Sequence, residues 1–227
     1  MYSILYTKLT VNLKFIQDGI LPKIKTSALR GGIGNMLLIN NCVNDRKCDL
    51  CSLKYICNFK NLFNRELIKN KKNTEKVSPS FTINCDNYNI RINKGEIVSF
   101  EIKVFQDSIA LLPILFDAIE SLGKFGLGSK SSEFFIEGIY NEDGELIYRD
   151  GNRNNSKIII NTLDNYVKSK KKQYVNILGI ELITPFRVKK SGKFAKQVDE
   201  RTLIMAVLRR IVTLKSFTES NIEINSK

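Results

Sequence analysis

Apolar and polar positions alternate through residues 1–15 (MYSILYTKLTVNLKF), a pattern that predicts a long strand with one buried face. Segments rich in Val, Ile, Phe and Thr predict three more strands at residues 81–85, 95–105 and 133–140. The turn-forming residues 141–145 (NEDGE) follow the last of these strands and predict a hairpin. The first two thirds of the chain therefore supply at least four strands.

Two segments between these strands carry the longer spacing of a helix. Residues 27–40 (SALRGGIGNMLLIN) predict a helix that three glycines weaken, each by about 1 kcal/mol relative to alanine. So many glycines near a helix start indicate close approach by a packed strand or by a phosphate backbone. Residues 107–122 (DSIALLPILFDAIESL) predict an apolar helix with Asp107 or Ser108 as its N-cap and a kink at Pro113.

The order of these elements predicts an α+β fold class. A strand, a helix, two strands, a helix and a strand form the βαββαβ pattern of a ferredoxin-like domain, which we expect over residues 1–148. In that fold two helices cover one face of an antiparallel sheet. A cysteine-rich segment at 42–57 interrupts the pattern after the first helix, and the charged residues 64–80 predict an exposed loop.

The rest of the chain predicts the opening of a second, similar unit. Residues 149–173 are polar and basic and are expected to link the two units. Residues 174–189 predict a strand, and residues 199–217 predict an amphipathic helix. We therefore expect residues 174–227 to form a partial second ferredoxin-like unit, either incomplete or completed by another subunit.

Four of the five cysteines lie close together with the spacing C-x5-C-x2-C-x5-C: Cys42, Cys48, Cys51 and Cys57. A C-x2-C pair can place two thiolates on one ion, and the outer cysteines can complete a tetrahedron, so this segment predicts a structural zinc knuckle. With four protein ligands the zinc has no open position, and it stabilises a loop without catalysing a reaction. An iron–sulfur cluster, redox-active thiols and disulfides are the alternatives. Disulfides are disfavoured because the N-terminus lacks the apolar core of a secretion signal.

Charge and composition narrow the possible functions. Lys and Arg number 36 against 23 Asp and Glu, and a net charge of +13 favours an anionic partner, most commonly nucleic acid. A lysine-rich chain without such a partner is the alternative. The chain has no histidine, which excludes Ser-His-Asp triads, Cys-His dyads and His-ligated metals. No apolar run is long enough to cross a bilayer, so we expect a cytoplasmic protein with no membrane partner.

Four motifs in order resemble the CRISPR-associated RAMP superfamily, and its branch of precursor-RNA-processing endoribonucleases with a cysteine insertion in particular. The first two are SALRGGIG at 27–34 and the cysteine cluster followed by NFKNLF at 58–63. The third is GKFGLGSKSSEFFIEGI at 123–139, a Gly-rich loop after a long apolar helix. The last is LITPFRVK at 182–189, followed by a helix with VLRRIVTL. The resemblance covers most of residues 1–217.

The resemblance implies a protein that binds CRISPR RNA and assembles with other CRISPR effector subunits, including a backbone protein. Cleaving members of the superfamily often use a histidine and complete a second domain, and this sequence shows neither feature. We therefore expect a subunit that holds the repeat-derived handle of guide RNA without cutting it. A histidine-free, metal-independent endoribonuclease is the second interpretation, for which no catalytic residue is identified. A zinc-knuckle module that binds other proteins is the third.

The candidate RNA-binding residues lie in two places. In the Gly-rich loop, glycines let backbone N–H groups approach a phosphate while lysines and serines add charge and donors. An ordinary helix-to-strand turn with a glycine C-cap is the alternative reading of this loop. At the first helix, basic side chains can contact phosphate or form surface ion pairs. The residues of the loop are Lys124, Gly126, Gly128, Ser129, Lys130 and Ser131, and those at the helix are Lys23, Lys25, Ser27 and Arg30.

Overall fold

The computed structural model describes residues 4–70, 73–170, 176–177, 179–182, 187–190, 193–195 and 197–218. Its centre is an antiparallel sheet in which β1 (Leu5–Phe15) lies between β7 (Ile97–Phe105) and β8 (Phe134–Tyr140), with β5 (Phe81–Asn84) beside β7. Counting these as the first to fourth strands of the βαββαβ unit, the spatial order is 4-1-3-2. All three pairings are antiparallel, so the structure confirms the ferredoxin-like fold.

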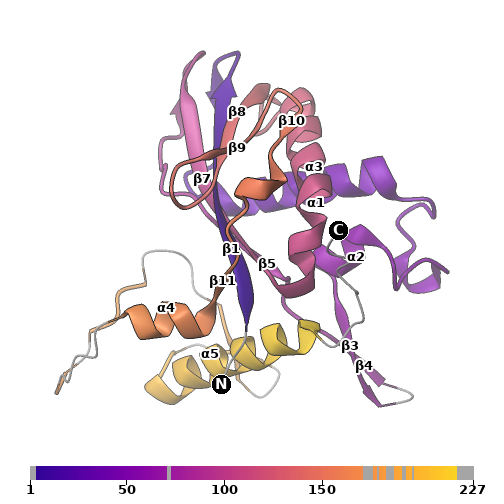
Figure 1. Ribbon diagram of the computed structural model, residues 1–227, viewed down its shortest axis with the longest axis vertical. Helices are drawn as coiled ribbons and strands as arrows, with labels where there is room; N and C mark the ends of the chain where they lie inside the picture. Colours follow the sequence, from indigo (N-terminus) through magenta and orange to yellow (C-terminus); the bar gives the residue numbers. More distant parts are fainter. Residues whose placement is uncertain are drawn as a thin grey trace.

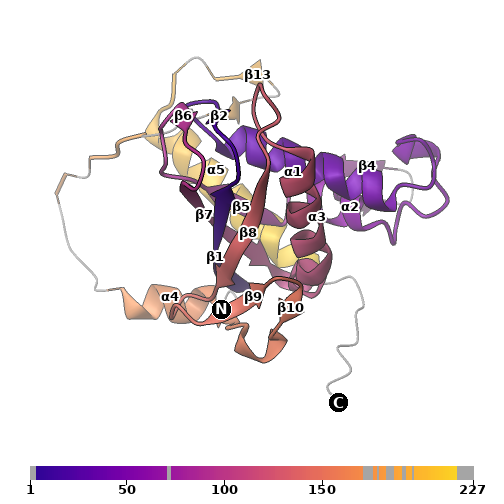
Figure 2. The ribbon, with the colours of Figure 1, turned by 90° about the horizontal axis from the view of Figure 1, so that it is seen from above.

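Two helices, α1 (Thr26–Asn41) and α3 (Leu112–Phe125), lie on the same side of this sheet (Figures 1 and 2). The alternation predicted for β1 decides which side they cover. Leu9, Val11 and Leu13 are buried beneath the helices, whereas the residues between them point to the open face. On the open face Glu101 pairs with both Lys8 and Lys103, at 2.7 and 2.8 Å.

Two of the three glycines in α1 are explained by helix packing. A Cβ at Gly32 would lie 2.7 Å from a methyl group of Leu122 on α3. A Cβ at Gly34 would lie 2.9 Å from the ring of Phe63, which ends α2 (Asn58–Phe63). The close approach predicted for these glycines is therefore made by neighbouring helices. Gly31 has nothing within 4 Å of its Cβ position.

The beginning of α3 differs from the prediction. Residues Gln106–Leu111 form a 3-10 helix, and Pro113 lies in the first turn of α3, where its missing N–H costs nothing, so it does not kink the helix. Neither predicted N-cap residue caps α3, since Asp107 pairs with Arg65 and the Ser108 hydroxyl donates to that of Ser80.

The prediction of an exposed loop at 64–80 is partly wrong. This segment contains a hairpin of β3 (Glu66–Asn70) and β4 (Asn73–Lys76), which Figure 1 shows projecting from the body. The predicted hairpin after β8 is confirmed, since β9 (Leu146–Arg149) pairs with it. The other short elements are β2 (Gly19–Ile20), β6 (Arg91–Ile92), β10 (Asn152–Arg153), β11 (Asn161–Thr162), β12 (Lys189–Lys190), β13 (Lys193–Phe194) and α4 (Leu163–Ser169).

The C-terminal helix, α5 (Glu200–Lys215), confirms the helix predicted at 199–217. Leu214 in its last turn and Phe217 in the 3-10 turn that follows form a small apolar cluster with Ile4 of the ferredoxin-like unit. Of the strand predicted at 174–189, residues 174–175, 178 and 183–186 lie outside the described residues. Among the described ones, only Lys189 lies in a strand, β12. The division into a domain, a linker and a partial second unit stays a prediction. Within the described ranges no helix could cross a membrane.

Candidate metal centre and nucleic-acid surface

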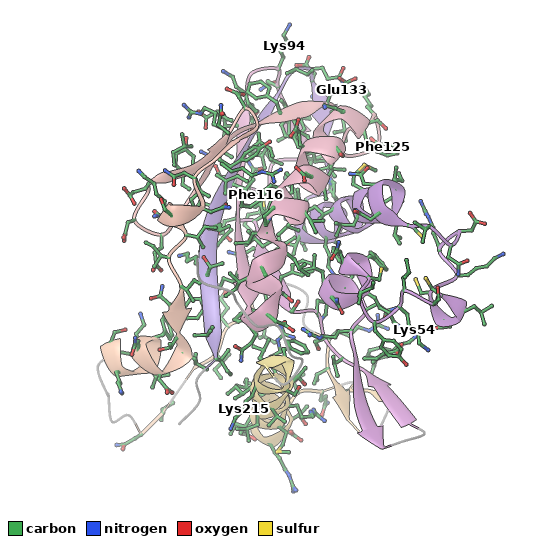
Figure 3. The ribbon with its side chains drawn as sticks, turned by 45° about the vertical axis from the view of Figure 1, so that its right-hand side comes forward. Lys54, Lys94, Phe116, Phe125, Glu133 and Lys215 are labelled. Atoms are coloured by element: carbon green, nitrogen blue, oxygen red, sulfur yellow. The ribbon has the colours of Figure 1, made fainter. Side chains whose placement is uncertain are left out.

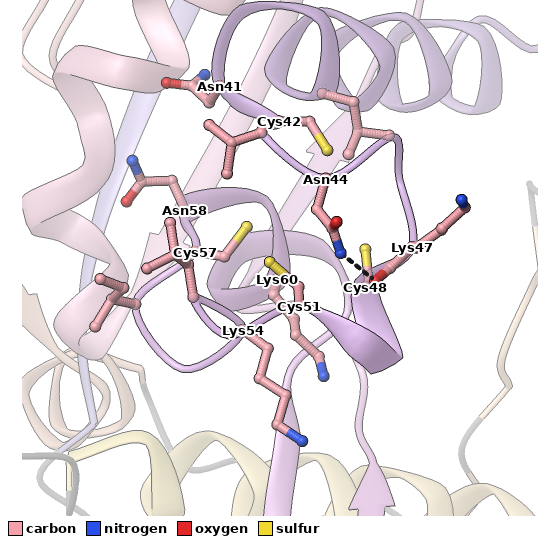
Figure 4. Close-up of a pocket in the computed structure, with 14 residues that line it drawn as sticks. Asn41, Cys42, Asn44, Lys47, Cys48, Cys51, Lys54, Cys57, Asn58 and Lys60 are labelled. Carbon is pink, nitrogen blue, oxygen red and sulfur yellow. Dashed lines mark hydrogen bonds between the residues drawn. The ribbon is translucent and has the colours of Figure 1, made fainter.

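The four clustered cysteines are placed by the ends of short elements. Cys42 follows the last residue of α1, and Cys57 is the N-cap residue of α2. Between them, Cys48 begins a 3-10 turn, Cys48–Leu50, and Cys51 ends it. In Figure 4 the four sulfurs surround one space from these different segments. The thiols that the spacing predicted to act together therefore lie around one cavity.

These thiols line a cavity of about 190 Å³. Asp45 and Arg46 adopt left-handed backbone conformations, with φ of 45° and 62°, which turn the chain tightly after Cys42. This turn brings the Arg46 N–H within 3.2 Å of the Cys42 sulfur, to which it donates a hydrogen bond. The cysteines form no disulfides.

Cations surround the thiols. Lys47, Lys54 and Lys60 line the cavity, and no carboxylate is among its lining residues. Lys60 is buried and forms an ion pair with Glu66 at 3.1 Å. The pKa of Cys48 is raised, chiefly by burial and then by the neighbouring Cys57 and Cys42, while Lys60 acts in the opposite direction. The site therefore holds positive charge close to groups that ionise when they bind a metal.

The donor set fits zinc, although the thiols stand apart. Four thiolates around Zn²⁺ carry a charge of −2, which Lys47 and Lys54 can offset, since Lys60 is paired with Glu66. Within the described part of the chain, no three His, Cys, Asp or Glu side chains are close enough to share an ion as they stand. The thiols would have to converge for an ion to bind. Zinc at this site stays a prediction.

A second cavity, a groove of about 430 Å³, runs between α1 and α2 beside the thiols. Its α1 wall presents residues at helical spacing, and its α2 wall is an aromatic pair whose ring centroids are 5.4 Å apart and nearly parallel. Leu38 lines both this groove and the thiol cavity. The lining residues are Ser27, Arg30, Gly31, Gly34, Asn35 and Leu38 from α1, and Phe59 and Phe63 from α2.

The candidate residues at α1 separate into two groups. Arg30 and Ser27 are exposed on the groove, and Arg30 lies 6.0 Å from the centre of the Phe63 ring. Lys23 is exposed just before the helix. Lys25, in contrast, is 0% exposed, and its ammonium donates to the carbonyls of Asn87 and Asn89. The prediction that Lys25 binds RNA is therefore wrong, because its buried ammonium holds the loop at Asn87 and Asn89.

The Gly-rich loop uses most of its backbone donors internally. The N–H groups of residues 126, 127, 129, 131 and 132 all donate to backbone carbonyls. Gly126 and Gly128 have φ of 86° and 85°, and a Cβ on either would lie within 2.3 Å of a carbonyl oxygen. These glycines are therefore explained by the turn itself, which leaves few N–H groups for a phosphate cradle.

The side chains of the loop remain available. Lys130, Ser129 and Ser131 are exposed, and so is Phe125, which Figure 3 labels at the end of α3. Lys124 forms a loose pair with Glu120 at 3.5 Å. Ser129 N–H donates to the carbonyl of Ile20, so the loop is tied to the segment that leads into α1. The structure thus brings the two groups of candidate residues to neighbouring parts of the molecule.

Three residues of this surface were not identified from the sequence. Phe59 and Phe63 lie on the groove, and Arg46 Nη2 donates to Asn35 Oδ1 at its edge, at 3.0 Å. The spacing of the phenylalanines in NFKNLF, four residues apart, was a usable signal, because it places two rings on one face of a helix. Nothing in the sequence places Arg46 beside α1.

Comparison with known proteins gives a matching family model and a set of matching solved structures. The family model AF_1859_N, an N-terminal domain, matches residues 4–159. No curated protein matches the chain. A chain from the Csm3–Csm4 subcomplex of the type III-A CRISPR–Cas interference complex is 12% identical, with a TM-score of 0.40 over 76% of this chain and 100% of that chain. The family match includes the sheet, α1, the cysteines and α2.

Proposed function

Since the chain belongs to the AF_1859_N family, and residues 4–159 form that domain, we propose that it is a CRISPR RNA-binding subunit of the RAMP type. It holds the repeat-derived handle of guide RNA within an effector ribonucleoprotein and does not cut it. The support comes from the four RAMP-like motifs and from the distribution of charge.

The charge distribution is the observation that carries this proposal. Residues 19–65, which include α1, the cysteines and α2, contain eight Lys or Arg against two Asp. Lys25, Lys60 and Arg65 are buried and contact groups inside the fold, so they do not contribute to the surface. The other five lie at the surface or on the cavities: Lys23, Arg30, Arg46, Lys47 and Lys54. A concentrated cationic surface of this kind suits a phosphate backbone.

Binding of repeat RNA over a range of salt concentrations tests the proposal. If four or five of these cations contact phosphate, log K against log salt has a slope of about −3 for a single strand. Neutralising Arg30, Arg46 and Lys47 with glutamine should make the slope shallower. Replacing Lys94, Lys103 and Arg149 with glutamine removes the same three positive charges away from this surface, and it should change the slope less. A slope near zero would instead favour a protein-binding module.

The same samples test for cleavage. End-labelled repeat RNA should stay intact both with and without EDTA. A discrete cut at one repeat position would replace the handle-holding function with a histidine-free endoribonuclease.

The proposal includes one structural zinc ion held by Cys42, Cys48, Cys51 and Cys57. The ion would join the end of α1 to the start of α2 and leave no position open for a substrate. Protein purified from zinc-supplemented cells should contain about one zinc per chain, and Cys51→Ser should lose most of it. Cys85→Ser is the matched control, because Cys85 is buried at the end of β5, away from the cluster. Equal metal content in both variants, or iron with visible absorption, would contradict the zinc site.

A further inference from the structure

Gly31 occupies an interior position of α1 that favours other residues. Glycine lowers helix stability relative to alanine, and at Gly32 and Gly34 the packing of Leu122 and Phe63 accounts for this cost. At Gly31 no atom lies within 4 Å of where a Cβ would be, so the fold gives no reason for glycine. Because Gly31 has no side chain, the α1–α2 groove that it lines stays open at this position.

The groove around Gly31 combines an aromatic wall with cations. Phe59 and Phe63 lie nearly parallel, with 7° between their planes, and both are half-buried. Arg30 lies over Phe63, and Arg46 is held at the edge through Asn35. No carboxylate lines the groove, which at about 430 Å³ has the size of a small-molecule site.

We propose that this groove binds one unpaired nucleobase of single-stranded RNA. The base packs against Phe59 and Phe63 over the bare backbone at Gly31, and Arg30 contacts its phosphate. Aromatic rings suit any base, and guanidinium groups suit phosphate, whereas an apolar peptide helix would gain nothing from the arginines. This inference rests on the proposed RNA-binding function and gives that function a defined base site.

The cysteine site is coupled to this groove through α2. Cys57 is the N-cap residue of the helix that carries both phenylalanines, and Leu38 lines both cavities. An ion held at Cys57 therefore fixes the aromatic wall relative to α1. Removal of the metal should weaken binding of the base as well as loosen the loop.

Gly31→Leu is the sharpest test, because it fills the groove while improving the helix. Its matched control is Gly179→Leu, the same change at another exposed glycine with nothing within 4 Å. The probe is a single-stranded RNA pool of randomised sequence, roughly 15 nucleotides long, containing photoreactive 4-thiouridine. Affinity, melting temperature and the position of cross-links are measured for each protein.

We expect Gly31→Leu to melt no lower than the wild type and to bind the pool at least ten-fold more weakly. Gly179→Leu should bind like the wild type, and wild-type cross-links should map to the peptide containing Phe59 and Phe63. If wild-type protein binds RNA but Gly31→Leu binds equally well and the cross-links lie elsewhere, the groove is not a base site and only this inference fails. If wild-type protein binds no RNA at all, the proposed function fails first.

Discussion

The ammonium of Lys25 is a buried hydrogen-bond donor that joins the start of α1 to a distant loop. It is fully buried and donates to two carbonyls of the segment that follows β5, at 2.9 Å from Asn87 O and 2.6 Å from Asn89 O. Its pKa is lowered by burial, which disfavours the charged form, while Cys85 and Glu96 act in the opposite direction. Its partners are 62 and 64 residues away in the sequence, so no local pattern could distinguish this lysine from Lys23.

Lys25→Met should therefore destabilise the fold rather than remove an RNA contact. It removes two charge-assisted hydrogen bonds to the carbonyls of Asn87 and Asn89, which costs about 1–3 kcal/mol in the free energy of unfolding. Chemical denaturation measures the loss, and hydrogen exchange should quicken at residues 85–90. Lys23→Met is the control, with an expected change within about 0.5 kcal/mol. A larger loss in Lys23→Met than in Lys25→Met would contradict this role.

Tyr148 predicts how stability depends on alkaline pH. Its pKa is raised to about 12, first by burial and then by the hydrogen bond from its hydroxyl to Glu120, at 2.7 Å. An unfolded tyrosine ionises near pH 10, so this contribution is complete below about pH 10 and is lost as the pH rises towards 12. The wild type should lose on the order of 1–2 kcal/mol more than Tyr148→Phe between pH 9 and pH 11.5. Urea denaturation at both pH values checks this, with Tyr88→Phe as an exposed control that should behave like the wild type.

At the scale of elements, an ion pair and an aromatic ring form one of the contacts that attach the α5 segment to the ferredoxin-like unit, beside the apolar cluster of Ile4, Leu214 and Phe217. The two terminal nitrogens of Arg65, Nη1 and Nη2, donate to the Asp107 carboxylate, and the same guanidinium lies 4.5 Å from the centre of the Phe217 ring. This contact therefore joins three places: the start of the β3–β4 hairpin, the 3-10 turn before α3, and the 3-10 turn Ser216–Thr218 that follows α5.

Arg65→Met should loosen α5. Removing the guanidinium takes the cation away from the largely buried Asp107 carboxylate and costs about 3–5 kcal/mol. Hydrogen exchange should then quicken in α5 and at residues 106–111, beyond any uniform change in β1. Arg149→Met is the matched control, because its pair with Glu137 is partly exposed and worth under about 1 kcal/mol. Equal protection of α5 in both variants would show that the apolar cluster alone holds the helix.

The elements that could be predicted are those whose own pattern decides their structure. The alternation in β1 and the apolar runs of β7 and β8 gave these strands, and their order gave the fold. The predictions failed where a residue distant in the sequence determines the local structure. Asp107 was expected to cap a helix, but Arg65 pairs with it and a 3-10 turn results. In the candidate site, spacing predicted the grouping of the cysteines, whereas the α1–α2 groove exists only through tertiary packing.

At the scale of the whole molecule, the cysteine segment is an insertion into a sheet-and-helix unit that has its own core. The large apolar cluster is built mainly from the sheet, α1 and α3, with Leu62 of α2 at its edge. We therefore expect metal loss to act locally first. The cysteines and α2 should lose order while β1, β7 and β8 keep theirs.

Hydrogen exchange before and after chelation measures this. Residues 42–63 should exchange faster without metal, and β1 should change little. Added Zn²⁺ should restore protection, whereas Mg²⁺ should not, because thiolates prefer zinc. Uniform loss of protection across the sheet would mean that the metal holds the entire fold.

The central position of β1 has a consequence for how the chain folds as it is synthesised. This strand is made early, yet its two main neighbours end at residues 105 and 140. At about 5–20 residues per second, the ribosome takes roughly 6–25 s to travel from Phe15 to Tyr140. During that interval the β8 edge of β1 has no native strand to pair with, and the apolar face of β1 depends on early packing of α1 or on a chaperone to shield it.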